Sequence, residues 1–112
     1  MKITDWTKQE IRETPHKVDV RLLYEKTDAQ VMHIQLQPGE TLKPHITPVD
    51  VFFYILEGTV DVRVGDKTVS VTKDNLVESP KDIPHCLSNS SKSTARILVT
   101  KTPKPTQNAR LL

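Results

Sequence analysis

The chain has 112 residues, with 16 basic and 14 acidic side chains, a formal net charge of +2 and a sequence pI near 8.7. This length fits one small domain and leaves no room for a second domain with a separate activity. The charges alternate in sign, and the only aromatic residues are one Trp, two Tyr and two Phe. Nucleic-acid binders usually combine a basic stripe with stacking aromatics, so we expect no nucleic-acid partner.

Cysteine usage and hydropathy indicate the compartment. Cys86 is the single cysteine, which excludes an intrachain disulfide framework and is consistent with a reducing environment. No apolar run reaches the length of a membrane span. The stretch Met1–Trp6 lacks the apolar core of a signal peptide. We therefore expect a cytoplasmic protein without a membrane partner.

Residues 1–17 are polar, with apolar anchors at Ile3, Trp6 and Ile11. Thr7, followed by Glu10, fits a capping box, and Pro15 would end any helix after about two turns. We predict an N-terminal arm over 1–17, either a short helix or an extended segment, packed on the body of the protein.

From Val18 onward the hydrophobic period changes to two, first in residues 18–22 and then in residues 31–37, where Met32, Ile34 and Leu36 share one face. This alternation is typical of half-buried antiparallel strands. Pro38-Gly39 predicts a turn. Residues 51–56 are apolar on both faces and predict a central strand.

The second half of the chain continues in short strands. Alternating valines over 60–64 precede Gly65-Asp66, a two-residue hairpin signal, and a return strand. Short strands at 76–77 and 86–87 and a last strand at 95–100 complete an all-β sandwich or barrel over 18–102. The tail 103–112 contains Pro103 and Pro105, so it cannot join a sheet interior, and we expect it on the surface or on a partner.

Two runs within this region share a recognisable spacing. The first run contains Gly39, His45 and Gly58. The second contains Pro80 and His85 and ends at Asn89. This pattern resembles the paired motifs of the cupin superfamily, and of its small single-domain members in particular, over roughly residues 18–102. The resemblance implies a single double-stranded β-helix, a jelly-roll barrel in which both histidines point into one mouth. It also implies a homodimer.

The same resemblance implies a metal site, and this sequence keeps half of it. The family motif has His-x-His, whose rings share a strand face because the side-chain period is two, then a glutamate and a third histidine from a facing strand. His45 and His85 match two of these ligands for a divalent metal such as Fe, Mn, Ni or Zn. Thr47 replaces the second histidine, and Val51 stands where the glutamate belongs. Protein sites usually provide three or four ligands, so no cofactor is firmly implied.

Other polar residues near the motifs have two interpretations each. Asp50 is either a displaced carboxylate ligand or a solvated acid at a strand end, and we favour the second. Glu78 is either an inward general acid/base or an outward surface carboxylate, and again we favour the second. Alternation places His33 on the surface or at an interface, and Cys86 is expected to be a buried structural thiol. No role is assigned to His16.

The leading functional hypothesis is a cupin that binds a small organic ligand in an apolar barrel pocket without a full catalytic metal site. The alternative is a mononuclear divalent-metal enzyme of isomerase, lyase or dioxygenase type that uses His45 and His85. A third hypothesis is a structural or partner-binding module. For either of the first two, the pocket would be lined by residues from both motifs and from the inward faces of the strands: Met32, His45, Thr47, Val51, Phe53, His85, Ile97 and Val99.

Overall fold

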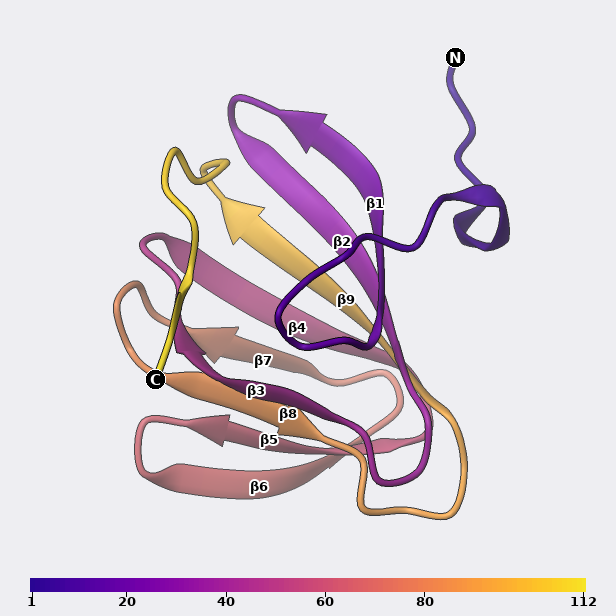
Figure 1. Ribbon diagram of the computed structural model, residues 1–112, viewed down its shortest axis with the longest axis vertical. Helices are drawn as coiled ribbons and strands as arrows, with labels where there is room; N and C mark the ends of the chain where they lie inside the picture. Colours follow the sequence, from indigo (N-terminus) through magenta and orange to yellow (C-terminus); the bar gives the residue numbers. More distant parts are fainter.

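The strands form two antiparallel sheets that face each other in a jelly roll, as the computed structural model of residues 1–112 shows (Figure 1). The first sheet has the order β1 (Asp19–Lys26), β2 (Ala29–Leu36), β9 (Ala95–Thr102), β4 (Asp50–Glu57) and β7 (Leu76–Ser79). The second has the order β10 (Arg110–Leu111), β3 (Thr41–Ile46), β8 (His85–Ser88), β5 (Thr59–Val64) and β6 (Lys67–Thr72). The predicted all-β double-stranded β-helix is confirmed.

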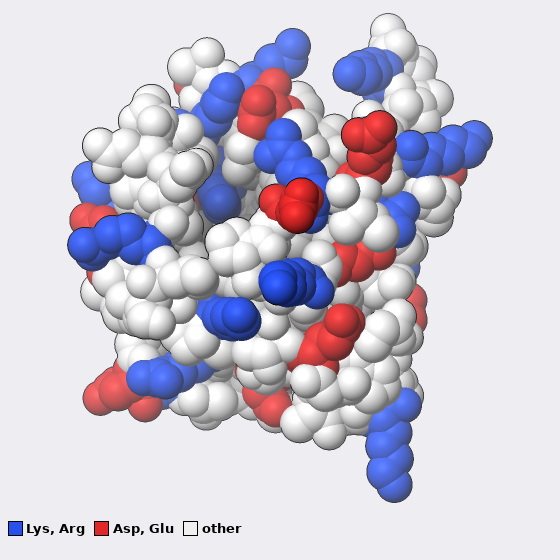
Figure 2. Space-filling model, viewed as in Figure 1, with Lys and Arg blue, Asp and Glu red and all other residues white.

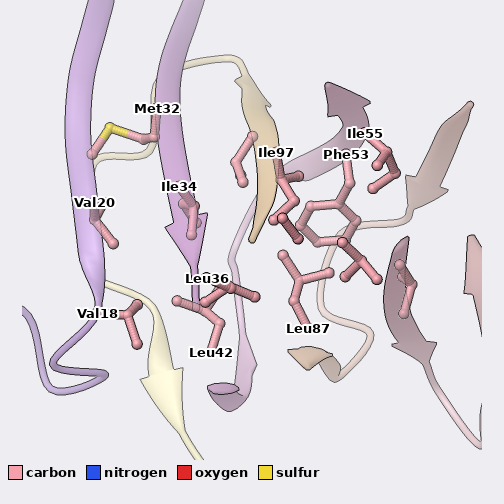
Figure 3. Close-up of a cluster of buried hydrophobic side chains, with 14 of the residues drawn as sticks. Val18, Val20, Met32, Ile34, Leu36, Leu42, Phe53, Ile55, Leu87 and Ile97 are labelled. Atoms are coloured by element: carbon pink, nitrogen blue, oxygen red, sulfur yellow. The ribbon is translucent and has the colours of Figure 1, made fainter. Parts of the chain in front are cut away.

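The hydrophobic core lies between the two sheets because alternate side chains of each strand face inward. In β2, Met32, Ile34 and Leu36 are buried as the period-two pattern predicts, and in β4 the buried residues are Val51, Phe53 and Ile55. Figure 3 shows side chains from both sheets meeting in this cluster, which contains 15 buried apolar residues. On the outward face of β4, Phe52, Tyr54 and Leu56 are half-buried.

All three glycines of the chain adopt positive φ at turns, a region open to glycine but strained for most residues. Gly39 follows Pro38 in the predicted turn, which is closed by the Glu40 N–H donating to the Gln37 carbonyl at 3.0 Å. Gly65 forms the two-residue loop between β5 and β6, so the predicted hairpin is confirmed.

Two aspartates stand where the second of the motifs that this chain resembles has glycine. Asp74 has φ of 68° and Asp82 has φ of 64°. Asp is one of the few residues that tolerates this left-handed region. Both aspartates therefore adopt a backbone conformation that glycine would adopt without strain.

The N-terminal segment contains a single helical turn. This turn is shorter than the helix of about two turns that Pro15 would allow. A 3₁₀ turn, η1, covers Trp6–Lys8, and its N-cap is Asp5, whose carboxylate accepts the Thr7 N–H at 2.9 Å. Asp5 rather than Thr7 is therefore the N-cap, and the rest of residues 1–17 is not helical. The Arg21 guanidinium holds the segment on the sheet by donating to the carbonyls of Trp6, Thr7 and Gln9 at 3.1–3.3 Å.

His33 lies beneath this segment, and the prediction of a surface or interface histidine was wrong. It does face away from Met32 and Ile34, but the Trp6 ring stacks on it at 4.1 Å between centroids, leaving His33 1% exposed. The Arg96 Nε–H donates to its Nε2 at 3.1 Å. Strand alternation gave the correct face of the sheet but could not show which distant segment covers that face.

The tail after β9 runs back across the open end of the barrel to the edge of the second sheet (Figure 1). Its last residues form β10, which pairs with β3 through Arg110↔Ile46 and Leu111↔His45. The two prolines lie before this short edge strand, which agrees with their exclusion from a sheet interior. No helix in the structure is long and apolar enough to cross a membrane.

Charged side chains of both signs are interspersed on the face drawn in Figure 2. The chain forms only three ion pairs, Arg21–Asp19, Arg96–Glu57 and Lys104–Glu25. Ion pairs at partly exposed positions contribute little to stability, so the fold depends mainly on the apolar core.

Gly58 provides a test of the turn geometry, with Gly39 as its matched control. A Cβ at Gly58 would lie 2.6 Å from the Thr94 carbonyl oxygen, whereas a Cβ at Gly39 would meet nothing within 4 Å. Both substitutions force alanine into positive φ, so Gly39→Ala should lower the free energy of unfolding by about 1–2 kcal/mol. Gly58→Ala should lower it by about 3 kcal/mol or more because the backbone must also shift. Urea unfolding measures both, and equal losses would contradict the close approach at Gly58.

Candidate functional site

A cavity of about 620 Å³ occupies the open end of the barrel. Its inner wall comes from β2, β3, β4, β8 and β9, and two segments outside the main sheets cover it. Residues 12–16 of the N-terminal segment line one side, and residues 104–109 of the tail line another. The same strands that form the core therefore continue into a cavity closed by the two ends of the chain.

Strand pairing brings His45 and His85 together. They are direct partners in the register between β3 and β8, and an irregularity in β3 between Leu42 and His45 sets this alignment. The His45 Nε2 and His85 Nε2 atoms lie 3.0 Å apart. Both residues are buried, with exposed fractions of 6% for His45 and 2% for His85. Thr47 follows β3, and its Oγ1 lies 3.2 Å from His85 Nε2. The structure thus brings His45, Thr47 and His85, the three polar residues predicted to line the pocket, within hydrogen-bonding distance of one another through His85.

The hydrogen-bond partners fix which nitrogen of each ring carries the proton in the neutral state. The Lys43 carbonyl can only accept, so His45 Nδ1 donates to it at 2.7 Å, leaving His45 Nε2 with its lone pair. His85 Nε2–H must then donate to His45 Nε2, and its Nδ1 accepts from the Ser79 hydroxyl at 2.7 Å. Thr47 Oγ1 shares the same His85 proton. The result is a directed chain from Ser79 through His85 and His45 to the backbone.

Burial keeps this chain neutral. It lowers the pKa of His85 to about 3, and the nearby positive charges of His45 and Lys101 add to the shift. Burial also lowers the pKa of His45, although its hydrogen bond to the Lys43 carbonyl opposes that change. Two imidazolium ions in contact inside a barrel would be strongly disfavoured.

Two residues at the site, His16 and Lys101, were not predicted from the sequence. His16 lies beside His45, with ring centroids 4.9 Å apart, and its Nδ1 accepts the Lys43 N–H at 2.8 Å. Nothing local in the sequence indicates that contact, because it joins the N-terminal segment to β3. Lys101 also lines the cavity. Here a signal existed, since Ile97 and Val99 face inward and the period of two places Lys101 on the same face.

Of the apolar residues predicted to line the pocket, Met32, Val51, Phe53 and Val99 do so. Ile97 does not: it is fully buried between Ile34 and Ile55, its partners in the register of the first sheet, and belongs to the core beneath the cavity. Alternation identifies the inward face of a strand but does not tell where along that face the core ends and the cavity begins.

The remaining polar candidates lie outside the cavity lining. Asp50 is exposed, and its carboxylate accepts the Lys81 N–H at 2.8 Å, so it is not a displaced ligand. Glu78 is exposed on β7, as its preferred interpretation predicted. Cys86 is half-buried, so the prediction of a buried thiol was wrong; it alternates outward between the buried His85 and Leu87.

The residues at the site do not fit a full metal centre of the kind the family motif describes. His45 and His85 provide two imidazole nitrogens, Thr47 provides a neutral hydroxyl, and Val51 provides no donor. No group of three or more His, Cys, Asp or Glu side chains is arranged to hold a metal ion. In the neutral hydrogen-bonded state, moreover, the His85 nitrogen that faces His45 carries a proton rather than a free lone pair.

The depressed pKa of His85 predicts loss of stability in acid. Its folded pKa of about 3 lies below the ordinary value of 6.5, so the unfolded chain binds more protons between these limits and stability falls as pH falls through them. The free energy of unfolding should drop below pH 6.5 by up to about 1.4 kcal/mol per pH unit from this histidine. Urea unfolding at pH 7, 6, 5 and 4 measures the slope.

Two variants assign that slope to its source. His85→Asn should reduce it and leave the part that comes from His16 and His33, whose pKa values burial also lowers to about 4. Ser79→Ala, which removes a hydrogen-bond partner but keeps the titrating ring, should preserve it. Equal slopes in wild type and His85→Asn would show that His85 is not the group responsible.

Comparisons with known proteins agree with this architecture. A protein from Thermus thermophilus, TT1209, is 30% identical in sequence, and the alignment covers 94% of this chain and all of that one with a TM-score of 0.80. The polyketide cyclase RemF from Streptomyces resistomycificus superimposes with a TM-score of 0.84 over 100% of this chain and 85% of its own. Its 20% identity makes that a likeness of fold alone.

A curated relative is the tetracenomycin polyketide synthase protein TcmJ from Streptomyces glaucescens, 31% identical over 72 residues. The match covers 63% of this chain and 48% of TcmJ, so it spans about half the length of that relative. The family model described as "Cupin domain" matches residues 32–101, which is more than half of the chain and includes His45 and His85. The chain therefore belongs to the cupin family.

Proposed function

We propose that this cupin binds a small organic molecule in the cavity at the open end of the barrel, without a tightly bound catalytic metal. The observation that carries the proposal is the neutral hydrogen-bonded chain through Ser79, His85 and His45, in a cavity whose remaining inner wall is largely apolar. A cavity of about 620 Å³ is in the range of small-molecule sites.

The chemistry of the wall suggests how a ligand would lie. Val51, Phe53 and Val99 offer apolar contact, and Phe53 also packs edge-on against His85 with centroids 5.2 Å apart. The Thr47 hydroxyl, which shares the His85 proton, can donate its own proton to a carbonyl or hydroxyl oxygen of the ligand. The name of TcmJ, a polyketide synthase protein, is consistent with an oxygen-bearing ring compound of this kind.

The competing proposal is a mononuclear divalent-metal enzyme of isomerase, lyase or dioxygenase type. The 3.0 Å separation of the two Nε2 atoms favours it, because two adjacent ligands at right angles on a metal with bonds of about 2.1 Å lie about 3.0 Å apart. The site lacks the further protein ligands that such a centre would need, which is why we place this function second.

Metal analysis separates the two proposals. Elemental analysis of protein purified without added metal should find less than about one tenth of an equivalent of Fe, Mn, Ni or Zn, because two imidazoles alone hold a transition metal weakly. Near-stoichiometric metal that is lost in His45→Ala would overturn the first proposal in favour of the second.

Filling the cavity tests ligand binding itself. Thr47→Trp places a large side chain beside His85 and should abolish binding of small aromatic compounds measured by isothermal titration calorimetry. Thr68→Trp, on the exposed strand β6, makes the same change outside the cavity and should leave binding intact. Because Thr47 is 2% exposed and its variant could unfold, Val51→Phe serves as a second filling variant, with folding checked by circular dichroism. Unchanged binding in a folded filling variant would contradict the proposed site.

A further inference from the structure

Lys101 is a cation without a partner in the inward-facing row of β9. Along this strand Ala95, Ile97 and Val99 are buried, and Lys101 continues the row into the cavity, where it is half-buried. The three ion pairs of the chain do not include it. An ammonium removed from water without a counter-charge costs free energy, and burial accordingly lowers the pKa of Lys101.

The charge of Lys101 acts on the polar end of the cavity. Its positive charge contributes to the lowered pKa values of His16, His45 and His85, so the ammonium lies within electrostatic range of all three rings. These histidines are neutral at pH 7, and none of them offers a negative charge to balance the lysine. The unpaired charge therefore lines the same cavity as the two histidines of the hydrogen-bonded chain.

The side chains around the cavity carry a net positive charge. Arg12, Lys101 and Lys104 line it, whereas Glu13 is the single carboxylate that does so. Lys104 is already paired with Glu25, at 3.3 Å, which leaves Lys101 as the unpaired lysine of the lining. A cavity lined by one sign of charge with low-dielectric walls concentrates ions of the opposite sign.

From these observations we infer that the ligand of this cavity is an organic carboxylate, with its charged group on Lys101 and its apolar body against Val51, Phe53 and Val99. The inference rests on the proposed binding function and adds the chemical class of the ligand. The Thr14 hydroxyl, which is buried without a partner in a residue that lines the cavity, provides a further donor from the N-terminal segment. An ionised carboxylate only accepts hydrogen bonds and has about four lone-pair sites for them, whereas an alcohol has two and also carries a donor proton of its own.

Matched pairs of ligands test the charge preference. Benzoate, 2-naphthoate and 2-anthroate are titrated by calorimetry at pH 7.5, each beside its neutral carboxamide, which has nearly the same shape. At least one carboxylate should bind about tenfold or more tightly than its carboxamide, because hydrogen bonds to charged groups are stronger than neutral ones. In Lys101→Gln the carboxylate should fall to the affinity of the carboxamide, while carboxamide binding stays within about twofold.

Lys67→Gln is the matched control, since it removes the same charge from a lysine that is exposed on β6 and lies outside the cavity lining. It should change carboxylate affinity by less than about threefold. A second readout is stability: Lys101→Met should raise the midpoint of thermal unfolding, because it removes an unpaired, half-buried charge, whereas a lysine with a purely structural role would lower it.

The outcomes distinguish this inference from the function on which it rests. If carboxamides bind as tightly as carboxylates, or if Lys101→Gln weakens both equally, the cavity binds small molecules but the carboxylate inference is wrong. If no member of either series binds at millimolar concentration, the proposed function is overturned, and this inference with it.

Discussion

The insertion of β9 between β2 and β4 is the constraint on which the rest of the molecule depends. These three strands come from distant parts of the chain, and β9 pairs with both neighbours along nearly its whole length. Forming these pairs closes long loops before any stabilising contact is gained, so the free energy must come from the apolar area buried on the inner face. Ile97, fully buried between Ile34 and Ile55, lies at the centre of that area.

The same strand then connects the core to the site. Moving along β9 from Ala95 to Lys101, the inward side chains pass from full burial, through Val99 at the cavity wall, to a half-buried lysine at the open end. A small jelly roll has one interior, which must provide both stability and binding. Its apolar residues can do both, but an inward-facing lysine adds nothing to the core, and this is why Lys101 is informative about function.

The histidine pair is positioned by the pairing of two strands. The register of β3 with β8 keeps His45 opposite His85, as the spacing of the two motifs predicts. With Thr47 and Val51 in place of further ligands, the two rings complete each other's hydrogen bonds and, through Ser79 and the Lys43 carbonyl, have partners for all four nitrogens. Because all four ring nitrogens have hydrogen-bond partners and both rings are neutral, the pair can be buried in the barrel without leaving an unpaired polar group.

The sequence by itself determined the all-β fold, the strands, the inward face of each strand and the turns at Gly39 and Gly65, because these follow from local rules: side chains alternate, and positive φ favours glycine. It also identified His45, from its spacing to Gly39 and Gly58, and His85, from its spacing to Pro80 and Asn89, because both spacings resemble the family motifs. Only the tertiary structure decided what covers each face. Contacts between segments far apart in the chain bury His33 beneath Trp6, bring His16 to His45 and draw the tail across the cavity, and no local pattern encodes them.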